Sequence, residues 1–120
     1  MTHEPSDLFP EFIRSWPMVD KPVVPLLGWL LQGPQGVAMF YELPDGADLA
    51  EHVHGAQWGV VLRGSVDFTI GGESRTYGPG ETYSIPAGIP HSAFMHPGTA
   101  GIDVFAEADR YAARPSVEEQ

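Results

Sequence analysis

Short apolar stretches alternate with turn-forming residues along most of the chain. The stretches that predict strands are residues 26–31, 37–43, 60–62, 66–70, 73–77, 81–85 and 100–106. Gly33-Pro34-Gln35-Gly36 separates the first two and predicts a turn, because its glycines accept unusual backbone angles. Gly71-Gly72 suits the two-residue loop of a hairpin, whose twist-matched turns need positive φ. Together with strand-like segments around residue 52 and after residue 91, these stretches give about eight to ten short strands, and no helical period is sustained, so the pattern is typical of an all-β sandwich or barrel.

The N-terminal region has a different pattern. Apolar residues recur there at roughly helical intervals, namely Leu8, Phe9, Phe12, Ile13 and Trp16. Pro10 and Pro17 bound them and limit any helix to about two turns. We therefore expect one domain with three parts: an N-terminal arm over residues 1–25, a barrel over 26–106 and a charged, irregular tail over 107–120. The arm is expected to lie on a sheet or on a second subunit, which favours a homodimer.

Composition supports one compact domain. A chain of 120 residues with 42% hydrophobic content can build a single core, and its 14 glycines and 12 prolines fit many tight turns. The chain has no cysteine, so disulfides, thiolate metal sites and cysteine nucleophiles are excluded. Any bound metal must use nitrogen and oxygen ligands.

Charge and hydropathy argue against two classes of partner. The formal net charge is −10, and only six residues are basic, which opposes binding to nucleic acid or to an anionic membrane. No apolar run approaches the ~20 residues of a membrane span. Residues 1–5 lack the basic and apolar segments of a signal peptide, so a cytoplasmic location is expected.

Histidines mark the candidate site. His52 and His54 are two residues apart, so on a strand they would point to the same face. The β-branched run that follows them favours a strand, and converging neutral imidazoles suggest a metal. A third histidine, His91, follows the turn Pro86-Ala87-Gly88.

These two segments closely resemble the two motifs of the cupin family. The matching positions are Gly46, His52, His54 and Gly64 in the first motif, and Gly80, Pro86, Gly88 and His91 in the second. Two positions depart from the family pattern, because Gln57 stands where cupins carry a glutamate and Met95 where they often carry an asparagine. The resemblance implies a cupin-type jelly-roll β-barrel in which His52, His54, Gln57 and His91 bind one metal ion.

Three nitrogens and one amide oxygen suit a divalent first-row metal, one of Fe, Mn, Ni, Co and Zn, rather than calcium. Gln57 removes the negative charge that a glutamate would add, so Fe(III) is stabilised less and Lewis-acid chemistry becomes more plausible. The alternative is a degenerate cupin whose histidines only fill the barrel.

Apolar and aromatic residues near the motifs are expected to line the pocket. The candidates are Met39, Trp58, Phe68, Ala93 and Met95. Tyr41 and Tyr83 are weak candidates for a catalytic role, because they are the hydroxyl-bearing aromatics near enough in sequence to donate a proton.

Two classes of function remain open. The first is a small metal-dependent enzyme, an oxygenase or a Lewis-acid isomerase, cyclase or lyase, that acts on a small, largely apolar, oxygen-bearing metabolite. The second is a non-catalytic cupin that binds or senses a small ligand. The resemblance to cupins implies the range of reactions in the first class, and the residues select none of them. The shortage of acid–base groups in the two motifs favours the second class.

Overall fold

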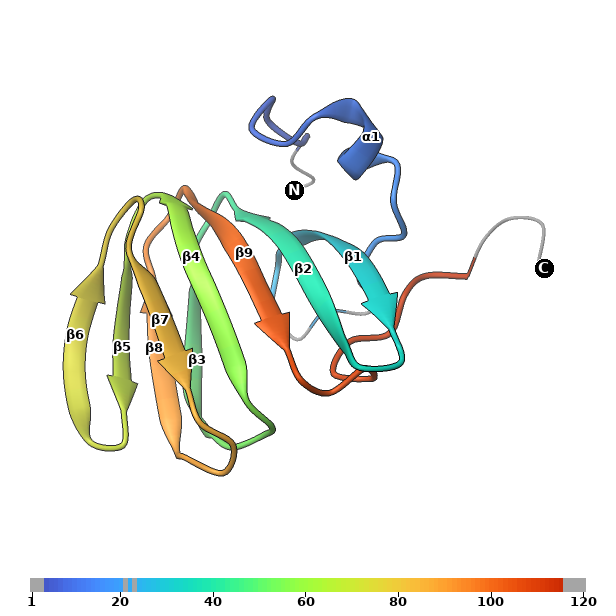
Figure 1. Ribbon diagram of the computed structural model, residues 1–120. Coiled ribbons are helices and arrows are strands. Elements are labelled where there is room, and N and C mark those ends of the chain that lie inside the picture. The colour runs from blue at the N-terminus through green and yellow to red at the C-terminus, as the bar shows by residue number, and fades with distance from the viewer. Residues whose placement is uncertain (1–3, 21, 23, 116–120) are drawn as a thin grey trace.

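The computed structural model describes residues 4–20, 22 and 24–115, and it consists of two facing antiparallel sheets (Figure 1). The ends of the predicted arm and tail, residues 1–3 and 116–120, lie outside the described residues. The strands are β1 (Leu27–Gly33), β2 (Gly36–Leu43), β3 (Ala47–His52), β4 (Gln57–Arg63), β5 (Val66–Ile70), β6 (Glu73–Tyr77), β7 (Thr82–Ile85), β8 (His91–Met95) and β9 (Thr99–Phe105). The expected all-β jelly roll is confirmed.

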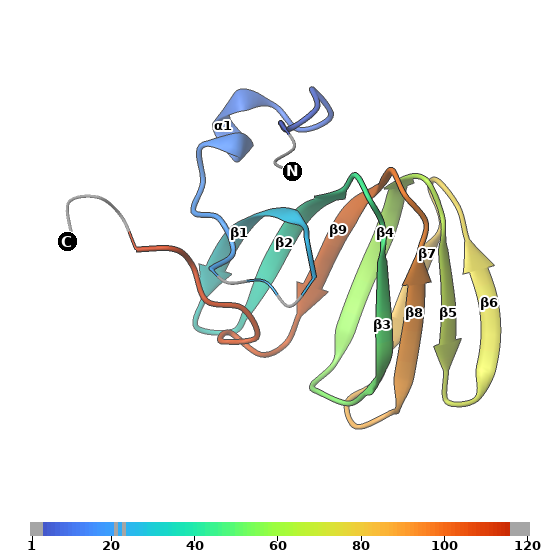
Figure 2. The same cartoon turned by 180° about the vertical axis from the view of Figure 1, so that it is seen from behind.

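The five-stranded sheet has the order β1-β2-β9-β4-β7, and the four-stranded sheet has the order β3-β8-β5-β6. Consecutive strands β3 and β4 therefore lie in different sheets, and the loop between them crosses from one layer to the other (Figure 2). The predicted hairpins are both present, since β1 pairs with β2 and β5 pairs with β6. Gly71 and Gly72 have φ values of 57° and 86°, as the two-residue loop requires.

The core lies between the two sheets. Strand alternation turns Val37, Met39 and Tyr41 of β2 inward, and all three are at most 3% exposed. The four-stranded sheet contributes Phe68 and Ala93 to the same cluster. Because both sheets bury one face and leave the other outward, odd positions of β2 and β4 face the interior and even positions face outward.

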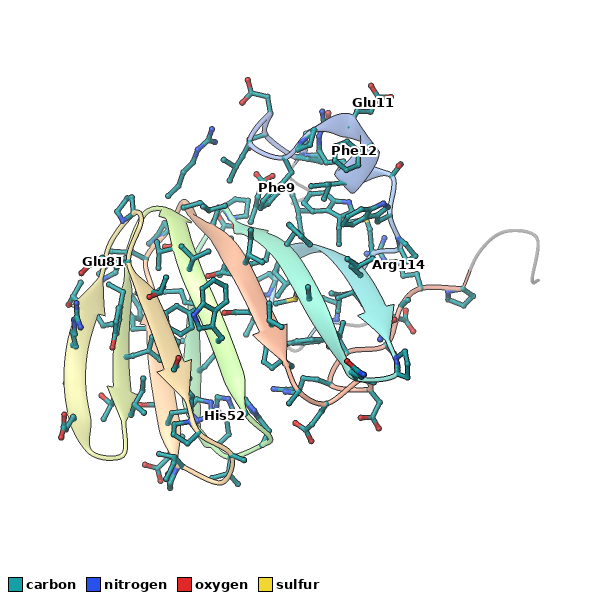
Figure 3. All side chains as sticks on the ribbon, viewed as in Figure 1. Phe9, Glu11, Phe12, His52, Glu81 and Arg114 are labelled. Atoms are coloured by element: carbon teal, nitrogen blue, oxygen red, sulfur yellow. The ribbon has the colours of Figure 1, made fainter. Side chains whose placement is uncertain are left out.

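The N-terminal arm covers part of the outer face of the five-stranded sheet. Its helix α1 (Glu11–Arg14) is one turn long, shorter than the two turns allowed by the prolines. Phe9 packs edge-on against Trp29 and Phe40, with ring centroids 6.1 and 5.6 Å away. In Figure 3, Phe9 points from the arm toward the sheet, whereas Phe12 lies on the helix and is 63% exposed.

The segment after β9 packs on the barrel, although the sequence predicted an irregular tail from residue 107. We call residues 106–115 the C-terminal strap. The backbone N–H of Asp20 donates to the carbonyl of Ala112, and the N–H of Arg114 donates to the carbonyl of Met18. The Gln32 side-chain amide adds two hydrogen bonds to strap carbonyls, at 2.8 and 3.0 Å. These contacts tie the strap to the chain that precedes β1 and to the end of β1.

No helix among the described residues is long and apolar enough to span a bilayer.

Candidate metal centre

Three histidines meet at one end of the barrel, and they come from two strands and a loop. His52 is the last residue of β3, and His91 is the first residue of β8 and its register partner. His54 lies in the loop between β3 and β4, so the expectation that both motif histidines lie on one strand is wrong. The pairing of β3 with β8 shifts between Leu49 and His52, and β3 then ends. The loop, rather than strand alternation, turns His54 toward the other two.

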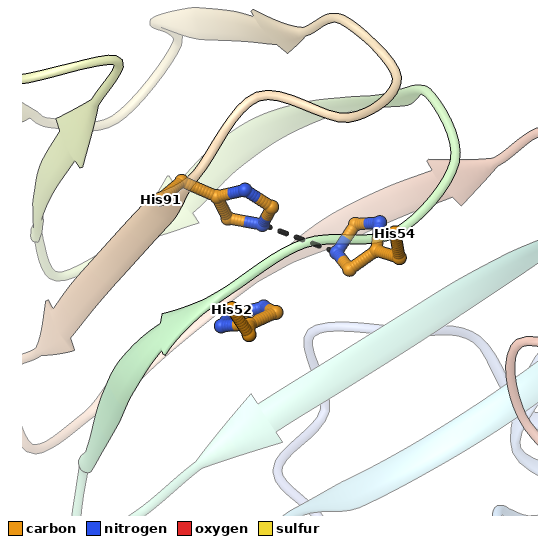
Figure 4. Close-up of side chains that lie close together, drawn as sticks. All are labelled: His52, His54 and His91. Atoms are coloured by element: carbon orange, nitrogen blue, oxygen red, sulfur yellow. Dashed lines mark hydrogen bonds between the residues drawn. The ribbon is translucent and has the colours of Figure 1, made fainter.

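The three imidazoles converge closely (Figure 4). One ring nitrogen from each lies within 4.8 Å of those of the other two. The Nε2 atoms of His54 and His91 are 3.1 Å apart. The ring centroid of His52 is 4.3 Å from that of His91 and 5.2 Å from that of His54.

Backbone carbonyls fix the tautomer of each ring. The Nδ1 atoms of His52, His54 and His91 lie 2.8, 2.8 and 2.9 Å from the carbonyl oxygens of Ala50, Gly55 and Ile89. A carbonyl oxygen only accepts, so each Nδ1 must carry a proton, and in the neutral form of each ring Nε2 is left with a lone pair. This arrangement is typical of metal-binding histidines, whose second ring nitrogen is held by an outer partner.

The electrostatics of His54 and His91 fit a cation. Burial lowers the pKa of His54 and of His91, and the positive charge of Arg110 lowers both further. Two neutral Nε2 atoms would then face each other with lone pairs 3.1 Å apart, which is unfavourable without a proton or a metal between them. Nitrogens bound about 2.1 Å from one ion can adopt this separation. The residues present therefore fit a divalent metal.

Gln57, the predicted fourth ligand, lines the same cavity as the histidines. It is the first residue of β4, faces inward and is 9% exposed. Its side-chain amide lies near the carboxylate of Asp103 and lowers the pKa of that acid, as a hydrogen-bond donor does. An amide that turns its nitrogen to Asp103 would have its oxygen left for a metal. The ligand role of Gln57 stays a prediction.

Asp103 is a buried acid that the sequence reasoning missed. It lies on β9, is 3% exposed, and accepts a hydrogen bond from the hydroxyl of Tyr83. Burial raises the pKa of Asp103 to about 6, and the hydrogen bonds from Tyr83 and Gln57 oppose that rise. The signal was present in the strand pattern, because Asp103 shares the inward face of β9 with Gly101 and Phe105.

Gly59 makes room for this buried pair. It pairs with both Asp103 and Tyr83 in the sheet register. A Cβ at position 59 would overlap the Asp103 carboxylate and the Tyr83 phenol. The absence of a side chain at this central strand position therefore lets Tyr83 reach across β4 to Asp103.

The cavity next to the histidines has a volume of about 680 Å³. Four of the predicted lining residues border it, namely Met39, Phe68, Ala93 and Met95. The fifth, Trp58, does not: because Gln57 faces inward, strand alternation turns Trp58 to the outer face, where it is 44% exposed. That part of the prediction is wrong.

The two candidate tyrosines differ in position. Tyr41 borders the cavity, and its buried hydroxyl has no well-aligned hydrogen bond among the described residues. Tyr83 is not among the residues that line the cavity, and its hydroxyl donates to Asp103. Burial, with the nearby Asp103 charge, raises the pKa of both phenols. Both therefore stay protonated at neutral pH.

The protein is therefore a jelly-roll β-barrel of two sheets, and three inward histidines at one end of the barrel form a potential metal centre. The sequence profile of the cupin domain matches residues 39–101, which is more than half of the chain, and the protein belongs to the cupin family. This confirms the resemblance seen in the two motifs. No curated protein sequence matches the chain.

Solved structures of similar fold include a cupin similar to RmlC from Shewanella frigidimarina, with a TM-score of 0.70 and 21% identity over 81% of this chain and 88% of that one. KdgF from Halomonas sp. matches with a TM-score of 0.63 and 23% identity over 83% of this chain and 89% of that one. Oxalate decarboxylase from Bacillus subtilis, which has Mn(II) centres, matches with a TM-score of 0.58 and 22% identity over 73% of this chain and 28% of that one. These likenesses establish the fold.

Proposed function

We propose that this protein binds one divalent transition metal, among Fe, Mn, Ni, Co and Zn, and uses it to act on a small, largely apolar, oxygen-bearing metabolite. One observation carries the proposal. All three histidines donate Nδ1–H to backbone carbonyls and direct Nε2 lone pairs into one cavity. Histidines that only filled the barrel would not need three separate backbone contacts with the same polarity. The Mn(II) centres of the oxalate decarboxylase with this fold agree with such a site.

In this proposal, His52, His54 and His91 hold the metal and the oxygen of Gln57 completes the set. A bound divalent metal would polarise a carbonyl, acidify water or activate dioxygen. Asp103 places a carboxylate behind Gln57, and with a pKa of about 6 it is mostly ionised at pH 7.5. The negative charge absent from position 57 is thus present one side chain farther away. This supports an oxygenase as well as a Lewis-acid isomerase, cyclase or lyase.

The remaining cavity residues would bind and orient the metabolite. Apolar side chains such as Phe68 and Met95 exclude water from its hydrocarbon part. Tyr41 keeps its proton and can donate a hydrogen bond to an oxygen of the metabolite.

Metal analysis tests the proposal directly. Protein stripped with chelator and resupplied with each of the five metals is expected to retain about one equivalent of at least one of them, and His54→Ala should lose it. His96→Ala is the matched control, because His96 pairs with Asp67 at a half-exposed site outside the cavity. A wild-type protein that binds none of the five metals, or a His54→Ala variant that binds as well as His96→Ala, would overturn the proposal.

A non-catalytic role in binding or sensing a small ligand is the second candidate. The observation that favours it is that Tyr83 donates its hydroxyl to Asp103 and does not itself line the cavity, so of this pair only Asp103 borders the space for a ligand. Fe(II)-loaded protein should be mixed with candidate ketones and catechols under anaerobic conditions and then exposed to oxygen. A charge-transfer band followed by oxygen uptake supports an oxygenase, and product formation without oxygen supports the Lewis-acid group. Tight binding without any product supports the sensing role.

A homodimer remains part of the proposal. The arm covers one part of the outer face of the five-stranded sheet, but a neighbouring row of this face is open. Leu31, Val104 and Trp58 lie along that row and are 55%, 40% and 44% exposed. An open apolar sheet face of this kind suits a second copy. Light scattering at micromolar concentration should show a dimer that Trp58→Ser weakens, and a monomeric wild type would contradict this. The cytoplasmic location stays a prediction.

A further inference from the structure

Arg110 brings a positive charge to the cavity wall. Of the described lysines and arginines, it is the one that borders the cavity. It lies on the C-terminal strap, outside the residues 39–101 that match the cupin domain, so the family motifs assign it no role. In sequence it is 19 residues beyond His91, and only the path of the strap brings it to the site.

Aromatic rings hold the guanidinium in place. Its carbon lies 4.9 Å from the ring centroid of Tyr111 and 5.6 Å from that of Phe105. Stacking of this kind orients the planar group and reduces its freedom. The strap itself is held by Gln32, which donates to the carbonyl of Tyr111, so the arginine is positioned before any ligand arrives.

The same guanidinium has unused binding capacity. Among the described residues, no carboxylate lies within 4.0 Å of it, and its buried Nε has no acceptor. Two acids of the strap are close to Arg110 in sequence. Asp109 is exposed, and Glu107 accepts a hydrogen bond from the backbone N–H of Gly55 at 2.8 Å. A buried donor without a partner is unfavourable, and a ligand oxygen would satisfy it.

Arg110 also shares its electrostatic field with the histidine cluster. Its charge contributes to the lowered pKa of both His54 and His91. Exposed acids at the cavity mouth, such as Glu51 and Asp109, are screened by water, whereas the stacked arginine is partly buried and is screened less. Asp103 and Glu107 also border the cavity, but neither lies within 4.0 Å of the guanidinium, so Arg110 keeps a local positive charge at its own part of the wall.

We propose that the cavity selects small organic carboxylates, with Arg110 holding the carboxylate while a second oxygen of the ligand faces the histidine cluster. The guanidinium fork matches the two oxygens of a carboxylate, and the apolar walls accept the hydrocarbon part. This inference rests on the proposed function, because it adds the class of metabolite to the proposed metal site. A 2-oxo acid with a branched apolar chain has the required groups.

Binding to the metal-loaded full-length protein tests the inference by calorimetry. The probes are 4-methyl-2-oxopentanoate and its methyl ester, which has the same carbon skeleton without the charge. The acid is expected to bind at least 10-fold more tightly than the ester. Arg110→Gln should weaken binding of the acid about 10- to 100-fold and change binding of the ester less than about 2-fold. Arg110→Lys, which keeps the charge but loses the fork, should fall between the two.

Arg75→Gln is the matched control, because Arg75 also stacks on a tyrosine, at 4.6 Å from the Tyr77 ring, but lies outside the cavity. It should leave binding of both probes unchanged. Equal binding of acid and ester, or an Arg110→Gln variant with the affinity of Arg75→Gln, would overturn the inference. If Arg110→Gln does not fold, the Arg110→Lys variant decides in the same way. Metal content is measured separately for each protein, so loss of the metal site refutes the proposed function, whereas a metal-loaded protein without preference for the acid refutes only this inference.

Discussion

Replacing Gln57 by glutamate would put a second carboxylate beside the buried Asp103. In the native protein the Gln57 amide lowers the pKa of Asp103, as a hydrogen-bond donor does, whereas burial raises that pKa to about 6. Glutamate is nearly isosteric but cannot donate when ionised, so the site loses a hydrogen bond to a charged group and gains a like-charge contact. We expect metal-free Gln57→Glu to be destabilised at pH 7.5.

The magnitude follows from the two changes. A hydrogen bond to a charged group contributes about 1.5–3 kcal/mol. The repulsion is limited, because the carboxylate pair can bind one proton when the two charges become too costly. A total of about 2–4 kcal/mol corresponds to a fall in Tm of roughly 8–15 °C for a domain of this size.

The pH dependence has a definite sign. In folded Gln57→Glu, the carboxylate pair at positions 57 and 103 has a pKa above that of unfolded carboxylates, as Asp103 already has in wild type. Between the unfolded and the folded pKa, the folded protein therefore binds more protons than the unfolded chain. The stability of Gln57→Glu relative to wild type should therefore be greatest at or below the unfolded carboxylate pKa of about 4, and it should be lost as pH rises through the pKa of the folded pair. A divalent metal relieves the same repulsion, so Gln57→Glu should bind metal at least as tightly as wild type, show a larger metal-induced rise in Tm, and shift bound iron toward Fe(III).

Thermal unfolding of four metal-free proteins, wild type, Gln57→Glu, Asp103→Asn and the double variant, measures the coupling between the two positions. The double variant exchanges donor and acceptor, so it should recover at least half of the stability that Gln57→Glu loses. If Gln57→Glu has the wild-type Tm at pH 7.5, or if the two substitutions are additive, Gln57 does not face Asp103 and the reasoning fails.

Three further predictions address the same end of the barrel. Because burial lowers the pKa of His54 and His91, protons should compete with metal only below the ordinary imidazole pKa of about 6.5, and competition titrations between pH 5 and 7.5 should show affinity falling toward the acid end. Gly59→Ala should destabilise the protein by about 1–3 kcal/mol in denaturant unfolding, because its Cβ overlaps the Asp103–Tyr83 pair; wild-type stability would disprove the overlap. Tyr83→Phe should cost more stability at pH 7.5 than at pH 5, since the lost hydroxyl donates to ionised Asp103, whereas Tyr77→Phe, whose ring packs beside Tyr83 without a hydroxyl hydrogen bond among the described residues, should show no such pH dependence.

Local features of the sequence determined the strands, the turns and the family. Alternation and paired glycines predict the hairpin of β5 and β6 with its bounds, because side-chain period and positive φ are properties of neighbouring residues. The spacing of His52, His54 and His91 likewise identified the cupin motifs and the residues that converge. These features depend on short stretches of chain, so they are readable without the fold.

Long-range contacts decided the rest of the site. Trp58 appeared to be a pocket residue until the inward position of Gln57 set the register of β4 and turned Trp58 outward. Asp103 looks like an ordinary strand residue in sequence, and it becomes a buried acid only because β9 lies between β2 and β4 and Gly59 leaves space opposite it.

Arg110 is another site residue that could not be predicted from the local sequence. A charged C-terminal segment predicts an irregular tail, because nothing near it in sequence pairs with it. Gln32 and the residues before β1, more than 75 positions away, hold the strap and bring Arg110 to the cavity. Which residues surround the metal centre was therefore decided by contacts between distant segments, and the energies of those contacts exist only in the folded chain.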